Sequence, residues 1–211
     1  MVITRFAPSP TGFLHIGNVR AALMNYLLAK KNDGIFILRI DDTDQERSKQ
    51  EYVDAIKRDL EWLGLEWDRI EYQSSRLELY NSASDKLRGI DLLYECFETP
   101  SELDLKRKKQ LNMGKPPVYD RAALALSDEE KLNLRNNRGD GHWRFKLEQN
   151  RIEWKDGILK DLSIDAASVS DPVLIRADGQ YLYTLASVVD DIDMGLSLIH
   201  ISSPRDETKS R

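Results

Sequence analysis

The feature that most constrains the fold of this chain is the interrupted pattern at its start. Residues Met1–Ile3 form an apolar opening with the character of a short buried strand. Pro8, Pro10 and Gly12 then exclude a regular element, because proline fixes one backbone dihedral and carries no N–H donor. A helix should follow, since apolar residues then recur at the spacing of one helix face. These residues are Val19, Ala22, Leu23, Tyr26 and Leu27.

His15 and Gly17 stand at the entrance of this predicted helix. A helix N-terminus has free backbone N–H groups and the positive end of the helix dipole, which together can bind an anion. Gly17 would let a nucleotide approach the backbone, and His15 could donate to phosphate oxygens. Taken alone, one histidine and one glycine at a helix start are better explained as an ordinary helix cap.

The rest of the chain alternates between two patterns. Residues Ile35–Ile40 are a nearly continuous apolar strand, which suits a parallel sheet covered on both faces. Strand, helix and strand in the first 40 residues make a βαβ unit. From residue 94 polar helices, loops and the hairpin signal Asp156-Gly157 predict an α+β insertion. The buried-strand pattern returns at Val173–Ile175.

The composition is that of a soluble globular protein, with 41% apolar and 32% charged residues among 211. No run approaches the ~18 apolar residues that a membrane span requires, and there is no signal-peptide pattern, so we expect no membrane association. Cys96 is the only cysteine, which excludes an internal disulfide and fits a reducing, cytoplasmic compartment. The formal charge of −5 argues against a general nucleic-acid coat, but a local basic patch could still bind RNA.

Three ordered blocks of sequence carry a more specific signal. The first runs from Arg5 to Asn18 and includes His15-Ile16-Gly17-Asn18, the second is Arg39–Asp44, and the third is Tyr181–Asp191. Together they resemble the class I aminoacyl-tRNA synthetases, and within these the glutamyl-tRNA synthetases, over residues 1–195. The family motif His-Ile-Gly-His is matched except at its last position, where this chain has asparagine.

The resemblance implies an α/β fold, a doubly wound parallel nucleotide-binding (Rossmann-like) sheet with an inserted α+β domain. We expect the first half of the catalytic domain at 1–93, an inserted acceptor-stem-binding domain at 94–170 and the start of the second half at 171–195. Residues 196–211 have no pattern of their own, and we expect an atypical, non-native tail there. The family continues into an Arg-Gly-Glu-Asp-His segment, a Lys-Met-Ser-Lys-Ser-type loop and an anticodon-binding domain, which this sequence does not contain. We therefore expect an incomplete and inactive version of the enzyme.

The resemblance also assigns roles to residues that match the family's motifs. The residues given a catalytic role are His15, Gly17 and Asn18. The residues given to ATP are Thr11, Gly12, His15, Gly17 and Asn18. The residues given to glutamate are Arg5, Ala7, Ser9, Asp41, Tyr183 and Ser187. The implied chemistry attaches no residue of the chain covalently to the substrate.

Several of these assignments compete with plainer interpretations. Arg5 could be an ordinary surface arginine, although its planar fork suits a carboxylate. Asp41 is one carbon shorter than the glutamate that the family commonly has at this position. The carboxylates that follow it resemble a metal site, but capping the next helix is the simpler role. Tyr183 and Ser187 lie one helical turn apart and could face the same cleft, or could be an ordinary half-buried tyrosine and helix serine.

Lys106, Arg107, Lys108 and Lys109 form a basic run on a predicted helix. A solvated helix face and contact with the phosphates of a tRNA acceptor stem explain this run equally well. Some relatives bind zinc in this region through Cys-x-Cys, whereas this chain has Cys96-Phe97-Glu98. One thiolate without a nearby histidine does not make a structural zinc site, so we expect no zinc and no other metal site.

The sequence is thus interpreted as the N-terminal catalytic part of a glutamyl-tRNA synthetase, a cytoplasmic ligase that we expect to be a monomer. Its substrates would be L-glutamate, ATP with Mg²⁺ and the acceptor stem of tRNA. Three alternatives stay open. They are a zinc-free paralogue that glutamylates a modified tRNA base, a non-catalytic fragment that binds nucleotide or RNA, and a class I nucleotidyltransferase that acts on a small molecule.

Overall fold

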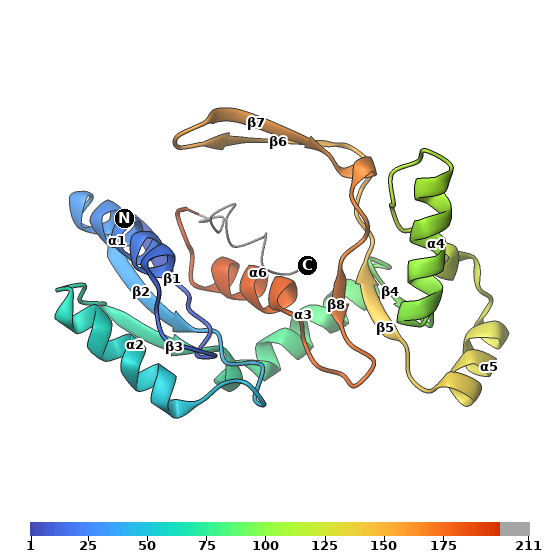
Figure 1. Ribbon diagram of the computed structural model, residues 1–211, viewed down its shortest axis with the longest axis horizontal. Helices are drawn as coiled ribbons and strands as arrows, with labels where there is room; N and C mark the ends of the chain where they lie inside the picture. Colours follow the sequence, from blue (N-terminus) through green and yellow to red (C-terminus); the bar gives the residue numbers. More distant parts are fainter. Residues whose placement is uncertain (199–211) are drawn as a thin grey trace. The chain divides into compact units, whose positions relative to one another are not determined.

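The structure is a computed structural model, and it describes residues 1–198. The chain divides into two compact units (Figure 1). Of the described residues, the first unit contains 1–80 and 186–198, and the second contains Asn81–Leu185. The two boundaries fall within helix α3 (Leu77–Gly89) and within helix α6 (Tyr183–Asp193).

The first unit is built on a parallel sheet of three strands. The strand order is β1-β2-β3, and each strand runs parallel to its neighbour. The strands are β1 (Ile3–Phe6), β2 (Ile35–Ile40) and β3 (Arg69–Tyr72), and the helices that connect them are α1 (Ile16–Lys31) and α2 (Gln50–Trp62). The first strand begins where the predicted apolar opening ends, because the residues that pair with β2 start at Ile3.

The two faces of this sheet are covered differently. Phe36, Leu38 and Ile40 of β2 point to one face, where they pack in one buried cluster with residues of α1 and α2. Ile37 and Arg39 alternate with them and therefore point to the other face, where Arg39 bonds to residues of α6. Helices thus cover both faces of a parallel sheet, which confirms the predicted α/β class.

The predicted apolar face of α1 was partly wrong. Leu23 and Leu27 are 41% and 52% exposed, whereas the residues of α1 that are buried are Ala22, Asn25 and Ala29. The Oγ1 of Thr4 in β1 donates to the carbonyl oxygen of Asn25 at 2.8 Å, so strand and helix approach each other closely. Small side chains permit that approach, and the larger leucines are turned away from the sheet.

The serines that precede α2 and α3 do not cap these helices. Lys49, not Ser48, precedes α2 as its N-cap, and no side chain caps this helix. Ser75 lies in the short 3₁₀ helix η1 (Gln73–Ser75), where its hydroxyl donates to the carbonyl of Tyr72 instead of capping α3. By contrast, capping boxes open two helices of the second unit, α4 (Pro100–Asn112) at Thr99 and α5 (Asp128–Arg138) at Ser127.

The second unit is α+β. Its main sheet is antiparallel, with the order β4-β5-β8, and a separate two-stranded ribbon is formed by β6 and β7. The predicted hairpin at Asp156-Gly157 is this ribbon. The strands are β4 (Leu93–Cys96), β5 (His142–Phe145), β6 (Arg151–Asp156), β7 (Lys160–Asp165) and β8 (Val173–Ile175). The helices are α4 (Pro100–Asn112), η2 (Ala122–Ala125), α5 (Asp128–Arg138) and η3 (Ala166–Ser168).

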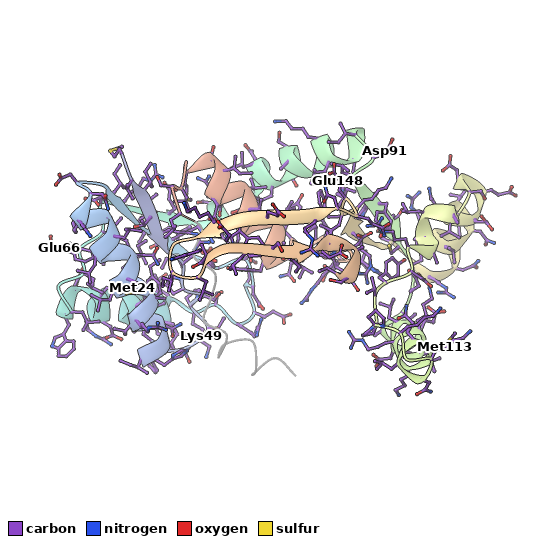
Figure 2. The ribbon with its side chains drawn as sticks, turned by 90° about the horizontal axis from the view of Figure 1, so that it is seen from above. Met24, Lys49, Glu66, Asp91, Met113 and Glu148 are labelled. Carbon is purple, nitrogen blue, oxygen red and sulfur yellow. The ribbon has the colours of Figure 1, made fainter. Side chains whose placement is uncertain are left out.

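No residue of α4 is fully buried, and Met113, which closes this helix, is exposed (Figure 2). Among the described residues, no helix has both the length and the apolar character needed to cross a bilayer.

The predicted atypical tail at 196–211 lies outside the described residues from 199 onward. Of its first residues, Ser197 lies beside β1. The backbone N–H of Ser197 donates to the carbonyl of Ile3 at 2.9 Å, and the Oγ of Ser197 accepts from the N–H of Ile3 at 3.0 Å. The chain after α6 therefore returns to the edge of the parallel sheet.

Gly34 provides a test of how β2 is seated against the start of β1. A Cβ at this position would lie 2.1 Å from the carbonyl oxygen of Val2, which itself accepts from the N–H of Ile35. We expect Gly34→Ala to lower the free energy of unfolding by about 1–3 kcal/mol, because the strand entry must shift. Gly89→Ala is the matched control, since nothing lies within 4 Å of its Cβ position. Chemical denaturation of both variants measures the difference, and equal stabilities would contradict this seating.

Candidate active site

Arg5 and Arg39 come to the same face and the same edge of the parallel sheet. Arg5 is paired in register with Ile37, and Arg39 follows Ile37 by two residues, so both side chains leave the sheet on the same side. Asp41 comes directly after β2, at the carboxyl end of the strand. In open α/β sheets this edge is where ligands bind.

Arg39 is the centre of a buried ionic cluster. Its guanidinium forms a two-pronged contact with Asp41, from Nε to Oδ1 at 2.6 Å and from Nη2 to Oδ2 at 3.0 Å. Its Nη1 donates to Oδ1 of Asp191 at 2.8 Å, and Nη2 also donates to the hydroxyl of Ser187 at 3.2 Å. The side chain of Arg39 is fully buried. Every nitrogen of the fork thus has an acceptor.

Arg5 shares the carboxylate of Asp191 with Arg39. The Nε of Arg5 donates to Oδ1 at 2.7 Å and its Nη2 donates to Oδ2 at 2.9 Å, and all of these side chains are buried. Two guanidinium groups and the carboxylates of Asp41 and Asp191 balance in formal charge. The Nη1 of Arg5 makes no hydrogen bond to any of the described residues.

The pKa values of this cluster are shifted by burial and by pairing. Burial raises the pKa of Asp41 from its usual 3.8 to about 6, and the hydrogen bond and charge of Arg39 oppose that rise. Burial lowers the pKa of Arg39, but its contacts with Asp41 and its attraction to Asp190 and Asp191 outweigh burial and raise it. Arg39 is therefore a fixed positive charge, whereas Asp41 keeps its negative charge only with the help of that arginine.

A second layer of contacts holds α6 in place. Asp190 is fully buried and accepts from Nε2 of Gln73 at 2.9 Å, from Nε of Arg76 at 2.7 Å and from the hydroxyl of Tyr80 at 2.9 Å and 3.0 Å. Burial, followed by the charge of Asp190, raises the pKa of Tyr80. Because Asp190 and Asp191 are neighbours on α6, this layer also fixes the carboxylate that Arg5 and Arg39 share.

The entrance of α1 has the geometry of a capping box. The Nδ1 of His15 accepts from the N–H of Gly17 at 3.0 Å, and the side chain of Asn18 accepts from the N–H of His15 at 3.1 Å. A Cβ at Gly17 would lie 2.8 Å from Cε1 of His15, so the imidazole fits closely over the glycine. Since Nδ1 acts as an acceptor, the neutral ring carries its proton on Nε2, and His15 is exposed to solvent.

The other residues predicted for the substrates lie in or near the loop after β1. Ala7 and Gly12 are partly buried, and Ser9 and Thr11 are exposed. The loop is tied to the chain after β2, because the N–H of Asp41 donates to the carbonyl of Pro8 at 3.0 Å. Of the two α6 residues, Ser187 belongs to the ionic cluster described above. Tyr183 is the exposed first residue of the helix and falls in the second unit.

The sequence analysis missed the residues that hold this site together. Arg39, Asp190 and Asp191 were inside the matched blocks, but they received no role there. The available signal was an arginine within an apolar strand, because a charged residue is almost never fully buried unless it is paired. Nothing in the sequence indicates that its partner would be Asp191, which lies 152 residues away.

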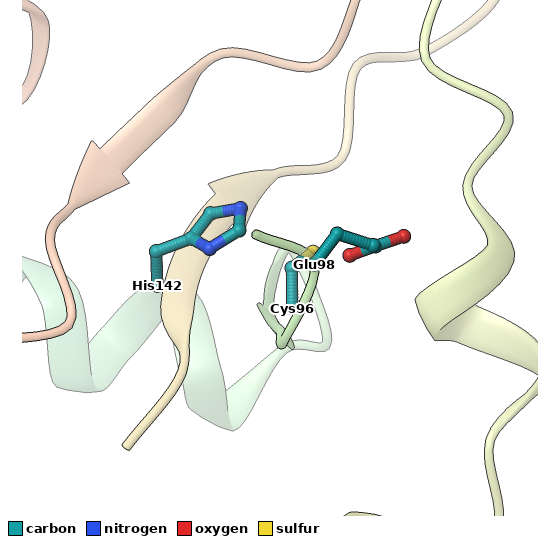
Figure 3. A group of neighbouring side chains, drawn as sticks. All are labelled: Cys96, Glu98 and His142. Atoms are coloured by element: carbon teal, nitrogen blue, oxygen red, sulfur yellow. The ribbon is translucent and has the colours of Figure 1, made fainter. Parts of the chain in front are cut away.

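In the second unit Cys96, Glu98 and His142 lie together (Figure 3). Their potential ligand atoms are within 4.8 Å of one another. The hydroxyl of Tyr119 donates to Oε1 of Glu98 at 2.9 Å and to Sγ of Cys96 at 3.5 Å, and Lys106 donates to the same Glu98 oxygen at 3.1 Å. The expectation that no histidine lies near Cys96 was therefore wrong, because β4 and β5 pair Cys96 with His142. A structural zinc ion takes four ligands, and this group offers three.

The basic run on α4 is not uniform. Lys106 is paired with Glu98 and Asp120, whereas Lys108 and Lys109 are exposed on the helix surface, as is Arg107. Burial lowers the pKa of Lys106, but its hydrogen bonds to Asp120 and Glu98 outweigh burial and raise it. Among the described residues, the charge of Lys106 is therefore already paired within the second unit, unlike those of its three neighbours in the basic run.

The chain matches the family described as "tRNA synthetases class I (E and Q), catalytic domain" over residues 1–201. It is 75% identical over 197 residues to Glutamate--tRNA ligase 2 of Ruegeria sp. (strain TM1040), with 93% of this chain and 45% of that relative covered. Glutamate--tRNA ligase 1 of Ruegeria pomeroyi is also 75% identical over 197 residues, with 93% and 44% covered. The chain therefore spans less than half the length of these curated relatives.

A solved structure gives the same picture at lower identity. The crystal structure of a glutamate tRNA ligase from Elizabethkingia meningosepticum, in complex with its amino acid, superimposes with a TM-score of 0.82 at 34% sequence identity. The match covers 92% of this chain and 42% of that chain.

Arg39 should be essential for the stability of the first unit. Arg39→Met would leave the buried carboxylates of Asp41 and Asp191 without their shared cation, and we expect a loss of about 3–5 kcal/mol in the free energy of unfolding. Arg47→Met is the control, since Arg47 pairs with Asp44 at the surface and such pairs contribute about 0–1 kcal/mol. Denaturant unfolding of both variants measures the two losses in the free energy of unfolding. Equal losses would show that the buried cluster contributes no more than a surface pair.

Cys96 should be inert in the folded protein. Burial raises the pKa of its thiol to about 11, so little thiolate is present near neutral pH. We expect alkylation of Cys96 at pH 8 to be about a hundredfold slower in the native chain than in denaturant. Because no other cysteine is present, mass spectrometry follows this residue directly. Similar rates in both states would mean that the strand carrying Cys96 opens readily.

Proposed function

The chain belongs to the class I tRNA synthetases of the glutamate and glutamine branch, and we propose that it activates L-glutamate with Mg-ATP for transfer to tRNA. The single observation that carries this proposal is the pair of buried arginines at the carboxyl edge of the parallel sheet. Arg5 and Arg39 are held there by Asp41 and Asp191, and the helix that follows β1 begins with residues that match the family's motif.

The proposed reaction has two steps. The α-carboxylate of glutamate attacks the α-phosphate of ATP, which forms glutamyl-adenylate and releases pyrophosphate. A ribose hydroxyl of the terminal adenosine of tRNA then attacks the activated carbonyl, and AMP leaves. Catalysis of this kind depends mainly on alignment and on stabilisation of the developing charge.

The amino acid would be held by groups that the cluster keeps in fixed positions. The Nη1 of Arg5 is the guanidinium nitrogen still able to bind a carboxylate of the substrate, because Nε and Nη2 are engaged by Asp191. The oxygens of Asp41 each have a remaining lone pair, so this carboxylate could accept from the substrate ammonium while it binds Arg39. A preorganised fork loses little freedom when the substrate arrives.

The phosphates of ATP would be held at the entrance of α1. The Nδ1 of His15 is occupied by the N–H of Gly17, which leaves the exposed Nε2–H to donate to a phosphate oxygen. The helix dipole adds favourable potential for an anion at this end. Asn18 orients the backbone of His15 from the helix side, so the imidazole, Gly17 and Asn18 act as one rigid element.

The choice of glutamate rests on the relatives, which carry the names of glutamate–tRNA ligases. The choice of tRNA rests on the same relatives and on the second unit, where Arg107, Lys108 and Lys109 present exposed positive charge on one helix. We propose that this unit contacts the acceptor stem through phosphate groups, which bind positive side chains without reading sequence. Because the chain spans less than half of its relatives, we expect this polypeptide by itself not to complete the reaction.

ATP–pyrophosphate exchange on the 211-residue chain tests the proposal. The assay is run with glutamate, with and without bulk tRNA, and in parallel on a version extended by the remaining length of a close relative. Exchange in the extended version that requires glutamate supports the proposed function. Two results would contradict the proposal: exchange that proceeds without glutamate, and an exchange rate that glutamate does not raise in either protein.

His15 should contribute directly to this rate. In a version that is active, we expect His15→Ala to lower the exchange rate by ~10² or more, because it removes a donor aimed at developing charge. Lys31→Ala, at the opposite end of the same helix, is the control and should leave the rate within about twofold. An unchanged rate in His15→Ala would refute the assigned role of the imidazole.

A further inference from the structure

Helix α4 and the segment 117–120 enclose a hollow of about 330 Å³ in the second unit. The helix contributes one face to it, with residues spaced three or four apart such as Leu103, Arg107 and Gln110. Strand β5 contributes Arg144. The hollow is closed on another side by Tyr119, whose N–H donates to the hydroxyl of Ser170 at 2.9 Å.

Arg144 is a buried cation without a carboxylate partner among the described residues. Its side chain is 8% exposed, its Nη1 donates to the carbonyl oxygen of Asp171 at 2.7 Å, and its Nε has no hydrogen-bond partner. The carboxylate of Asp171 is taken by the hydroxyl of Tyr94 and by Arg121. The guanidinium also stacks on the ring of Tyr119, 4.2 Å from its centroid.

Arg144 differs in this respect from the buried arginines of the first unit, because Arg5 and Arg39 are each paired with a carboxylate. A guanidinium removed from water loses a large hydration energy, which is normally offset by a paired anion and further hydrogen bonds. The backbone carbonyl and the ring of Tyr119 supply part of that compensation. An anion in the adjoining hollow would supply the rest, because Arg144 lines it.

Three cations and two carboxylates line the hollow. Lys106 and Arg107 also line it, and Asp104 and Asp120 oppose them. Lys106 is already neutralised by Glu98 and Asp120, so Arg107 joins Arg144 as a cation without an ion pair among the described residues. Asp104 is the one lining carboxylate for which the described residues provide no ion pair, and it would repel an anion.

We propose that this hollow binds a phosphate group through Arg144 and Arg107. Guanidinium groups match the geometry of phosphate oxygens and form charge-assisted hydrogen bonds to them. Leu103, Pro117 and Val118 add an apolar wall, and the volume lies at the lower end of the range of small-molecule sites. The ligand is therefore a phosphate with a small apolar or aromatic body, either in a free metabolite or as one nucleotide unit of RNA. The assignment of the phosphate to RNA rests on the proposed function, whereas its assignment to a free metabolite does not.

The test is a titration of the ¹⁵N-labelled 211-residue chain with inorganic phosphate, followed by NMR. We expect saturable shifts at the backbone amides of Tyr119 and Arg144, and we expect them to be weakened about tenfold in Arg107→Ala and in Arg144→Lys. Lys155→Ala is the control, since this exposed lysine of β6 belongs to the same unit and does not line the hollow. Asp104→Asn should strengthen binding severalfold, because it removes the opposing charge.

The outcomes separate the possible sources. If a short RNA hairpin displaces inorganic phosphate from these amides, the source is a backbone phosphate, and if it does not, the source is a free compound. Arg107 is exposed, so its variant should fold even if Arg144→Lys does not. Absence of shifts at Tyr119 and Arg144, or shifts that Arg107→Ala leaves unchanged, would overturn the proposal. Phosphate bound at the entrance of α1 would shift the backbone amide of Gly17 instead. The absence of a shift at Gly17 would therefore count against the proposed function and not against this hollow.

Discussion

The first unit depends on the neutralisation of one buried arginine. Arg39 projects from the middle strand of the parallel sheet into the buried interior, where an unpaired guanidinium would cost several kcal/mol. Asp41 comes from the end of the same strand, and Asp191 comes from a helix near the other end of the described chain. The charge can be buried only when both arrive together. Its neutralisation therefore joins the sheet to α6 and, through Asp191, to Arg5 on the neighbouring strand.

The two adjacent aspartates of α6, Asp190 and Asp191, bind different sets of side chains. Asp191 binds Arg5 and Arg39. Asp190 binds Gln73, Arg76 and Tyr80. Neighbouring residues on a helix point about 100° apart, so one turn of helix reaches two partner sets. The two sets meet at Arg39, because Oδ2 of Asp190 also lies 3.7 Å from its Nε. As a result, the positions of the groups proposed to bind glutamate are fixed by contacts that do not themselves touch the substrate. This is how a rigid second layer gives a site its geometry.

Among the described residues, both units keep a few buried polar side-chain atoms without a hydrogen-bond partner, three in the first unit and four in the second. Glu98, His142 and Arg144 each keep one buried polar atom without a hydrogen-bond partner among the described residues, and they lie around Tyr119 and Cys96 or beside them. Burial lowers the pKa of His142, and the charge of Arg144 lowers it further, so both favour the neutral imidazole. In the first unit, by contrast, each nitrogen of Arg39 has an acceptor. Incomplete satisfaction around an accessible hollow is what distinguishes Arg144 from an ordinary structural arginine.

Local pattern alone determined the order of elements, the alternating faces of β2, the helix caps whose hydrogen bonds span three residues, and the hairpin at Asp156-Gly157. It also placed His15 at a helix entrance, because periodicity and turn residues act over a few positions. The tertiary structure decided which side of α1 is buried, since close approach to β1 favoured Ala22 over Leu23. It also decided that Arg5 and Arg39 would share one carboxylate. Pairing across 152 residues depends on how the chain folds back, and no local spacing encodes that distance.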